Sequence, residues 1–215
     1  AMIEVAEACL QHKFEKEPLI VATSGRYEFR NKGLDVFMES LKRLASFKLD
    51  REILAYVMVP AANNGARADL VRHMEDATQP IDEKQWKHST HYLENTEWDS
   101  IARSISGSVL EGADSKVKVI FVPSYLNSAD GVFNKNYYEM LVGMDLTAYP
   151  SYYEPWGYTP LESIAFSVPT ITSNLSGFGL WAVKLADHDG VEVIRRDDNN
   201  DAYAVEQLVD YALRY

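Results

Sequence analysis

Apolar runs alternate with amphipathic stretches along most of the chain. Residues 19–23 and 53–59 are continuous apolar runs, which are typical of strands buried on both faces. Between them, five apolar residues recur at helical spacing and predict a helix with one apolar face: Leu34, Phe37, Met38, Leu41 and Leu44. A strand, a helix and a second strand in succession indicate a parallel pair joined by a helical crossover.

The same alternation continues along the chain. Further strands are predicted at 117–122, 146–149, 170–172 and 191–194, and further helices at 138–142, 161–166, 178–185 and 202–213. The sequence therefore predicts an α/β fold of the Rossmann-like type, with a doubly wound parallel sheet. Ligands bind such a sheet at the carboxyl ends of its strands.

Two stretches depart from this alternation. Residues 65–115 are polar and rich in charged residues and histidine, and we predict that they form a helical insertion at the edge of the domain. Residues 1–17 predict an amphipathic helix that leads into the main domain, which we expect to comprise residues 18–215.

Composition narrows the classes of function. The chain has 215 residues, of which 47% are hydrophobic, so it can bury one sizeable core. A net charge of −11 argues against nucleic acid and anionic membrane surfaces as partners. No apolar run approaches the roughly 20 residues of a membrane span, and no signal-peptide pattern is present. The single cysteine, Cys9, excludes an internal disulfide and favours a reducing, cytoplasmic location.

Candidate chemistry concentrates around two glutamates, Glu154 and Glu162, which lie eight positions apart across a Trp-Gly turn. Thr159 and the proline after it are typical of an N-cap followed by the first helical residue. A helix that starts there presents the free backbone N–H groups of residues 157–159 to an anion such as a diphosphate. Two simpler interpretations stay open, since Thr159 and Glu162 also fit a capping box and Glu154 also fits a solvated loop.

The whole string around these glutamates resembles a known family. EPWGYTPLES (154–163), followed by VPTITSNLSGFG (168–179), closely resembles the nucleotide-sugar-binding loop of eukaryotic-type glycogen synthases, whose E-x7-E pattern the two glutamates match. SGRYEFRNKG (24–33) is similar to a second loop of that family, and PAANN (60–64) to a weaker third block.

The resemblance implies a place in a larger enzyme. Members of the family are retaining glucosyltransferases of the two-domain GT-B architecture. Residues 18–215 would then be the C-terminal, nucleotide-sugar-binding domain, and residues 1–17 a linking helix from a missing N-terminal acceptor domain. We accordingly expect a fragment that binds a nucleotide but turns over nothing alone, because the cleft that orients the acceptor is missing.

Roles for individual residues are also implied. Glu154, Arg26 and Lys32 match the family's catalytic positions: the glutamate would hold the glucose, and the two cations the diphosphate. The remaining contacts are implied for Glu162 at the ribose, for Tyr125 and Tyr137 on the two faces of uracil, and for Trp156, Gly157, Tyr158 and Thr159 in the turn. From the residues alone, a solvated loop in which Arg26 pairs with Glu28 stays open.

The implied function is to bind UDP-glucose, from which glucose is transferred with retention to the 4-hydroxyl of an α-1,4-glucan. UDP-glucose and the glucan are the expected partners, and a homo-oligomer of the full enzyme is compatible with the resemblance. Two alternatives stay open. One is a retaining GT-B glycosyltransferase with another acceptor or nucleotide sugar, and the other is a non-catalytic nucleotide-sugar-binding module.

No cofactor and no metal are implied. Asp187-His-Asp189 has the form of a metal-holding D-x-D but is predicted to be an ordinary turn. His88, His91 and Glu94 recur every three residues and predict a solvated helix face rather than a set of metal ligands.

Overall fold

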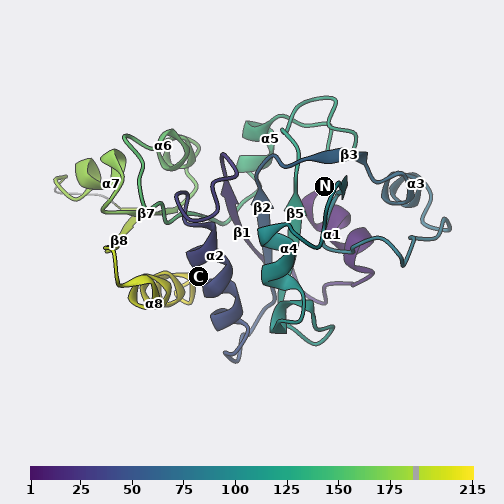
Figure 1. The fold of residues 1–215 in the computed structure, drawn as a ribbon, viewed down its shortest axis with the longest axis horizontal. Helices are drawn as coiled ribbons and strands as arrows, with labels where there is room; N and C mark the ends of the chain where they lie inside the picture. Colours follow the sequence, from purple (N-terminus) through teal and green to yellow (C-terminus); the bar gives the residue numbers. More distant parts are fainter. Residues whose placement is uncertain (186–188) are drawn as a thin grey trace.

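The computed structural model describes residues 1–185 and 189–215, and a parallel sheet of six strands forms its centre (Figure 1). Its strands are β1 (Leu19–Ser24), β2 (Ile53–Met58), β5 (Val117–Val122), β6 (Leu146–Tyr149), β7 (Thr170–Ser173) and β8 (Val191–Ile194). They lie in the order β5-β2-β1-β6-β7-β8, and every neighbouring pair is parallel. The Rossmann-like class predicted from the apolar runs is confirmed.

The direction of the chain across the sheet reverses between β1 and β6. After β1 the chain adds β2 and then β5 on one side, and it returns to place β6 on the other side of β1. In a doubly wound sheet, this reversal opens a crevice outside the carboxyl ends of the two central strands. The loops that follow β1 and β6 therefore meet at the crevice.

Helices cover both faces of the sheet. The helices are α1 (Met2–Leu10), α2 (Leu34–Leu44), α3 (Ala68–Glu75), α4 (Ser100–Ile105), α5 (Tyr137–Leu141), α6 (Tyr158–Ala165), α7 (Gly177–Ala182) and α8 (Asp201–Ala212). Side chains alternate between the two faces of the sheet along each strand. Those on one face pack with α2, α4 and α8, and those on the other face pack with α1, α3 and α5. Helices α6 and α7 pack together beside β8, around Phe178.

The predicted helical insertion contains more than helices. Strand β3 (Asn63–Ala66) pairs antiparallel with β4 (His91–Leu93), a ribbon that the sequence analysis did not predict. Of the two helices in this region, α4 packs on the main sheet through Ile101 and Ile105 and so belongs to the crossover between β2 and β5. Buried Arg67 pairs with Asp69, at 2.6 Å between Nη2 and Oδ2, and ties the ribbon to α3.

Helix α1 is docked on the sheet rather than extended from it. Val5, Ala6 and Cys9 are fully buried in the core cluster that contains α3 and α5. The Sγ atom of Cys9 lies 3.9 Å from the carbonyl oxygen of Ser89, and burial raises the pKa of the thiol to about 12. In residues 1–185 and 189–215, no helix is both long enough and apolar enough to cross a bilayer.

Candidate functional site

A cavity of about 330 Å³ opens at the carboxyl ends of β1 and β2, beside the first turns of α5 and α6. Five of the residues predicted from the sequence line it: Arg26, Tyr125, Tyr137, Thr159 and Glu162. They come from loops and helices up to 136 positions apart in sequence, and the reversal between β1 and β6 brings them together. Half of the ten predicted site residues thus line this cavity. The other five, which are Lys32, Glu154, Trp156, Gly157 and Tyr158, do not.

The sequence analysis missed part of the lining. Ser24, Met58, Pro60, Ser124 and Leu126 also face the cavity and give it a largely apolar surface. The positions of Ser24, Met58, Pro60 and Ser124 were a usable signal, because each stands at the end of a strand or within two residues after one. Nothing in the sequence marks Leu126.

Two tyrosines form walls of the cavity. Tyr125 is 73% exposed and leaves its ring free, whereas Tyr137 is mostly buried. The Tyr137 hydroxyl accepts a hydrogen bond from Ser24 Oγ at 3.0 Å and lies 3.0 Å from the Tyr149 hydroxyl. Burial raises the pKa of Tyr137 far above its ordinary value, so this phenol is neutral at physiological pH.

The first turn of α6 differs from the prediction at its start. The helix begins at Tyr158 and its N-cap is Gly157, whose φ of 101° suits glycine; Thr159 is already helical and caps nothing. Glu162 accepts a hydrogen bond from the Tyr138 hydroxyl at 2.9 Å, so the capping-box interpretation of Thr159 and Glu162 is wrong.

The amide donors expected in this turn are available. Within the described part of the chain, no acceptor pairs with the N–H groups of Gly157, Tyr158 and Thr159. Together with the positive end of the helix dipole, these donors can hold an anion at the rim of the cavity.

Lys32 and Glu154 face one another where the β1 loop meets the β6 loop. Lys32 Nζ donates to Glu154 Oε2, and their side chains are 14% and 20% exposed. Gly33, with φ of 70°, packs so tightly on Pro150 that a Cβ would lie 2.0 Å from the Pro150 carbonyl oxygen. The Tyr152 N–H donates to the Asn31 carbonyl at 2.9 Å, which fastens the two loops a second time.

The backbone of Glu154 is also fixed from its other side. Its N–H donates to the Leu175 carbonyl at 3.2 Å, and the Gly177 N–H donates to its carbonyl at 3.0 Å. Trp156 turns outward and packs against Phe178 and Trp181, with ring centroids 6.3 Å away from each. Neither Trp156 nor Tyr158, which is exposed, lines the cavity.

The two arginines of the β1 loop have acidic neighbours. Arg26 Nε lies 3.2 Å from Glu28 Oε1, so the ion pair that the sequence left open as a simpler interpretation does form. The arginine is nevertheless largely exposed, and it also lines the cavity. Arg30, to which no role was assigned, lies 3.8 Å from Asp35 and 3.6 Å from Asp201.

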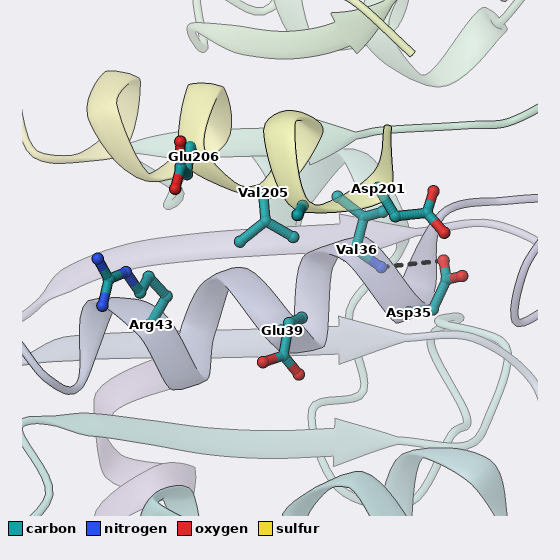
Figure 2. A pocket seen from close by; sticks show the side chains of 8 residues that line it. Asp35, Val36, Glu39, Arg43, Asp201, Val205 and Glu206 are labelled. Carbon is teal, nitrogen blue, oxygen red and sulfur yellow. Dashed lines mark hydrogen bonds between the residues drawn. The ribbon is translucent and has the colours of Figure 1, made fainter. Parts of the chain in front are cut away.

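A second cavity, of about 480 Å³, lies between α2 and α8 (Figure 2). Its lining includes four acidic residues and one arginine: Asp35, Glu39, Asp201, Glu206 and Arg43. None of the predicted site residues contributes to it. Its charge has the wrong sign for a diphosphate, so it does not compete with the first cavity as an anion site.

The histidine cluster is not a solvated helix face, and that prediction was wrong. His88 and His91 are both 2% exposed, and His91 belongs to strand β4. His88 Nδ1 lies 2.9 Å from the Val119 carbonyl oxygen, and His91 Nε2 lies 3.0 Å from that of Asp130. In the described residues, no group of three His, Cys, Asp or Glu is placed to hold a metal. Asp187 lies outside those residues.

The strand order and the crevice at its reversal place the chain in the class of Rossmann-like α/β proteins. A family model described as glycogen synthase matches residues 7–87 and 83–215. The chain therefore belongs to the glycogen synthase family, which confirms the resemblance of the loop sequences.

Individual relatives agree with this assignment. Glycogen [starch] synthase isoform 1 of Saccharomyces cerevisiae is 29% identical over 255 residues, covering 87% of this chain and 36% of the yeast protein. Glycogen [starch] synthase of Neurospora crassa is 29% identical, and the match covers 95% of this chain and 37% of the relative. Glycogen [starch] synthase, liver, of Homo sapiens is 28% identical, and the match covers 77% of this chain and 31% of the relative. The chain thus spans about a third of the length of these relatives.

Among solved structures, the chain is similar to WaaG, a glycosyltransferase involved in lipopolysaccharide biosynthesis. The sequence identity is 20% and the TM-score 0.48, over 100% of this chain and 42% of that one.

Proposed function

We propose that this chain is the donor-binding domain of a glycogen synthase of GT-B architecture. It would hold UDP-glucose, from which glucose passes with retention to the 4-hydroxyl of an α-1,4-glucan. The observation that carries the proposal is the cavity beside the strand reversal. This chain belongs to the glycogen synthase family, and five of the residues that match the family's donor site line the cavity: Arg26, Tyr125, Tyr137, Thr159 and Glu162. A cytoplasmic location, where nucleotide sugars and glucan meet, belongs to the same proposal.

The nucleoside would occupy the apolar part of the cavity. Tyr125 offers an exposed ring and Tyr137 a fixed one, and stacking of a base between them would contribute on the order of 1–3 kcal/mol. Glu162 stands at the same cavity and has oxygen acceptors for the ribose hydroxyls, in competition with the Tyr138 hydroxyl.

The diphosphate would lie at the first turn of α6. The free amides of Gly157, Tyr158 and Thr159 point to this role, and Arg26 can swing from its exposed pair with Glu28. During transfer, negative charge develops on the leaving diphosphate. Donors already in place stabilise that charge without reorganisation, so these groups would lower the barrier directly.

Lys32 would change partners when the donor binds. In the free chain it neutralises Glu154, and an arriving diphosphate would compete for its ammonium group. The released carboxylate could then accept hydrogen bonds from glucose hydroxyls and position the anomeric carbon. Glu154 would hold the sugar. No covalent nucleophile is assigned, because in this proposal the acceptor attacks from the same face that UDP leaves.

Calorimetric titration with UDP, ADP and UDP-glucose tests the proposal directly. We expect saturable binding of both uridine ligands and much weaker binding of ADP. Arg26→Ala should weaken UDP binding about 10- to 150-fold, the equivalent of one charge-assisted hydrogen bond. Arg103→Ala, on α4 away from the cavity, is the matched control and should leave the affinity unchanged.

Other outcomes select other functions. Tighter binding of a different nucleotide sugar would favour a retaining transferase with another donor. Binding of UDP-glucose by a parent protein that transfers no glucose would favour a non-catalytic module. Absence of binding by all three ligands would contradict the proposal for this chain.

A further inference from the structure

A row of buried hydroxyl groups runs behind the wall of the cavity. It starts at Ser24 at the end of β1, passes Tyr137 and Tyr149, and ends at Ser163 in α6. The successive oxygen atoms are 3.0, 3.0 and 3.3 Å apart. Ser24 and Tyr137 line the cavity, whereas Tyr149 and Ser163 lie behind it and are 5% and 0% exposed.

Two hydrogen bonds of this row have an assigned donor, Ser24 and Ser163, and counting protons gives the direction of the other two. A hydroxyl has one proton to donate, and Ser163 Oγ donates its own to the Thr159 carbonyl at 3.1 Å. Tyr149 must therefore donate to Ser163, and Tyr137 must donate to Tyr149. Ser24 donates to Tyr137, so all four protons run the same way, from the cavity wall toward α6.

Because Ser24 Oγ donates to Tyr137, the Tyr149 hydroxyl is the acceptor in this row for the Tyr137 proton. The Tyr149 hydroxyl also lies 3.4 Å from Ser24 Oγ. The Tyr137 ring packs against the core cluster of α1, α3 and α5 on one side and faces the cavity on the other, so this hydrogen bond fixes its hydroxyl end. Buried hydroxyls add little net stability compared with apolar side chains of the same shape, because their desolvation offsets the bonds that they form. A satisfied row of this kind chiefly selects one geometry.

We propose that Tyr149 is a positioning residue for the nucleotide, which it does not touch: its hydroxyl holds the Tyr137 ring in the orientation that forms one wall of the cavity. The inference rests on the proposed function, since it names a determinant of base binding at that same site. The first turn of α6 is independent of Tyr149, because Ser163 is the donor to Thr159 and keeps that bond without it.

A double-mutant cycle on UDP affinity tests this role. Tyr149→Phe removes only the hydroxyl, and we expect UDP binding to weaken about 3- to 10-fold, the range of one hydrogen bond. Affinity for inorganic pyrophosphate should not change, because its amide donors stay in place. In a Tyr137→Phe background, which retains the stacking ring, the same substitution should change UDP affinity less than about twofold.

Tyr211→Phe is the matched control, since its hydroxyl contacts that of Tyr215 far from the cavity, and it should alter neither affinity. Equal losses from Tyr149→Phe in both backgrounds, or parallel losses of UDP and pyrophosphate, would overturn the positioning role and indicate a general structural one. Failure of the unsubstituted chain to bind UDP would overturn the proposed function, and the inference with it. Binding of UDP without coupling between the two tyrosines overturns the inference alone.

Discussion

The carbonyl oxygen of Pro150 is the point at which three loops of the site meet. Arg196, which follows β8, donates to it from Nη1 at 2.5 Å, and Gly33 of the β1 loop presses against it. Arg196 is itself buried and held by Asp201, at 2.8 Å from Nη2 to Oδ1. The separation of Lys32 and Glu154 is therefore set by backbone packing as well as by their charges.

Replacement of Gly33 by alanine should separate these loops. The new Cβ would meet the Pro150 carbonyl, and φ of 70° is itself unfavourable for alanine. We expect the free energy of unfolding to fall by about 1–2 kcal/mol for the backbone and about 1–3 kcal/mol more for the clash. Urea denaturation measures the sum.

Gly107 offers a matched control for that experiment. Its φ of 68° is nearly the same, and a Cβ there would meet no atom within 4 Å. Gly107→Ala should therefore show the backbone cost alone. If both variants lose equal stability, the contact between Gly33 and Pro150 does not restrict the loop.

The pairing of Lys32 with Glu154 predicts different effects of one substitution on two ligands. In Glu154→Gln, Lys32 keeps its charge but loses its ionic partner, so UDP should bind about two- to fivefold more tightly. UDP-glucose should gain less affinity than UDP or lose affinity, because the amide is a weaker acceptor for sugar hydroxyls. Calorimetry measures the affinities of UDP and UDP-glucose for the variant and the unsubstituted chain. Weaker UDP binding by Glu154→Gln would contradict the proposal that Lys32 moves from Glu154 to the diphosphate.

At the scale of elements, α5 depends on its cap. The helix has five residues, too few to be stable alone, and Asn136 and Glu139 form a reciprocal capping box at its start. Asn136 Oδ1 accepts from the Glu139 N–H at 3.1 Å, and Glu139 Oε2 accepts from the Asn136 N–H at 2.9 Å. Tyr137 is the first residue of this helix, so the cap also supports the cavity wall.

Asn136→Ala should lower the stability of the protein by about 1 kcal/mol and speed hydrogen exchange in α5. Amide exchange read by mass spectrometry over Tyr137–Leu141 is the direct measurement. Asn199→Ala, in the loop before α8, changes an asparagine side chain with no hydrogen bond among the described residues and serves as the control. Unchanged protection of α5 would show that packing alone holds the helix.

Elements were predictable where burial dictates their sequence. The strands β1, β2 and β5 are apolar runs because both of their faces are covered, and α2 shows its buried face at helical spacing. The ribbon β3–β4 was not predictable. Its strands read NNGA and HYL, with no alternation, and their paired residues are 25 and 30 positions apart in sequence.

The start of α6 shows a different limit. Thr159 followed by proline has the local sequence of a cap, yet Gly157 fills that role because only glycine readily adopts its left-handed backbone. The predicted site residues that line the cavity were identified through the resemblance of the loop sequences to a known family, and not through periodicity. Tyr149 could not be identified as a site residue from sequence, since its importance lies in hydrogen bonds to residues 12 and 14 positions away.

At the scale of the whole molecule, stability should depend on pH through a buried histidine. Burial lowers the pKa of His88 to about 4, below the value near 6.5 of an unfolded chain. Between these values the unfolded state binds a proton that the folded state does not. Stability is therefore lost as the pH falls below about 6.5, and burial of His91 acts in the same direction.

We expect His88 to account for about 2 kcal/mol of lost stability between pH 7.5 and pH 5. The comparison is between urea unfolding of the unsubstituted protein and of His88→Gln, whose amide can still donate to the Val119 carbonyl. The variant should show a shallower dependence on pH over that interval. Identical slopes for the two proteins would exclude His88 as the source.

The burial of Cys9 makes this protein suitable for labelling with a fluorescent dye at an introduced cysteine. The chain has no other cysteine, and a buried thiol with so high a pKa reacts slowly with maleimides at neutral pH. A cysteine placed at Val142, which is exposed at the end of α5, would then take up a dye selectively. Such a dye would sit on the same helix as Tyr137 and report nucleotide binding by fluorescence, without removal of the native thiol.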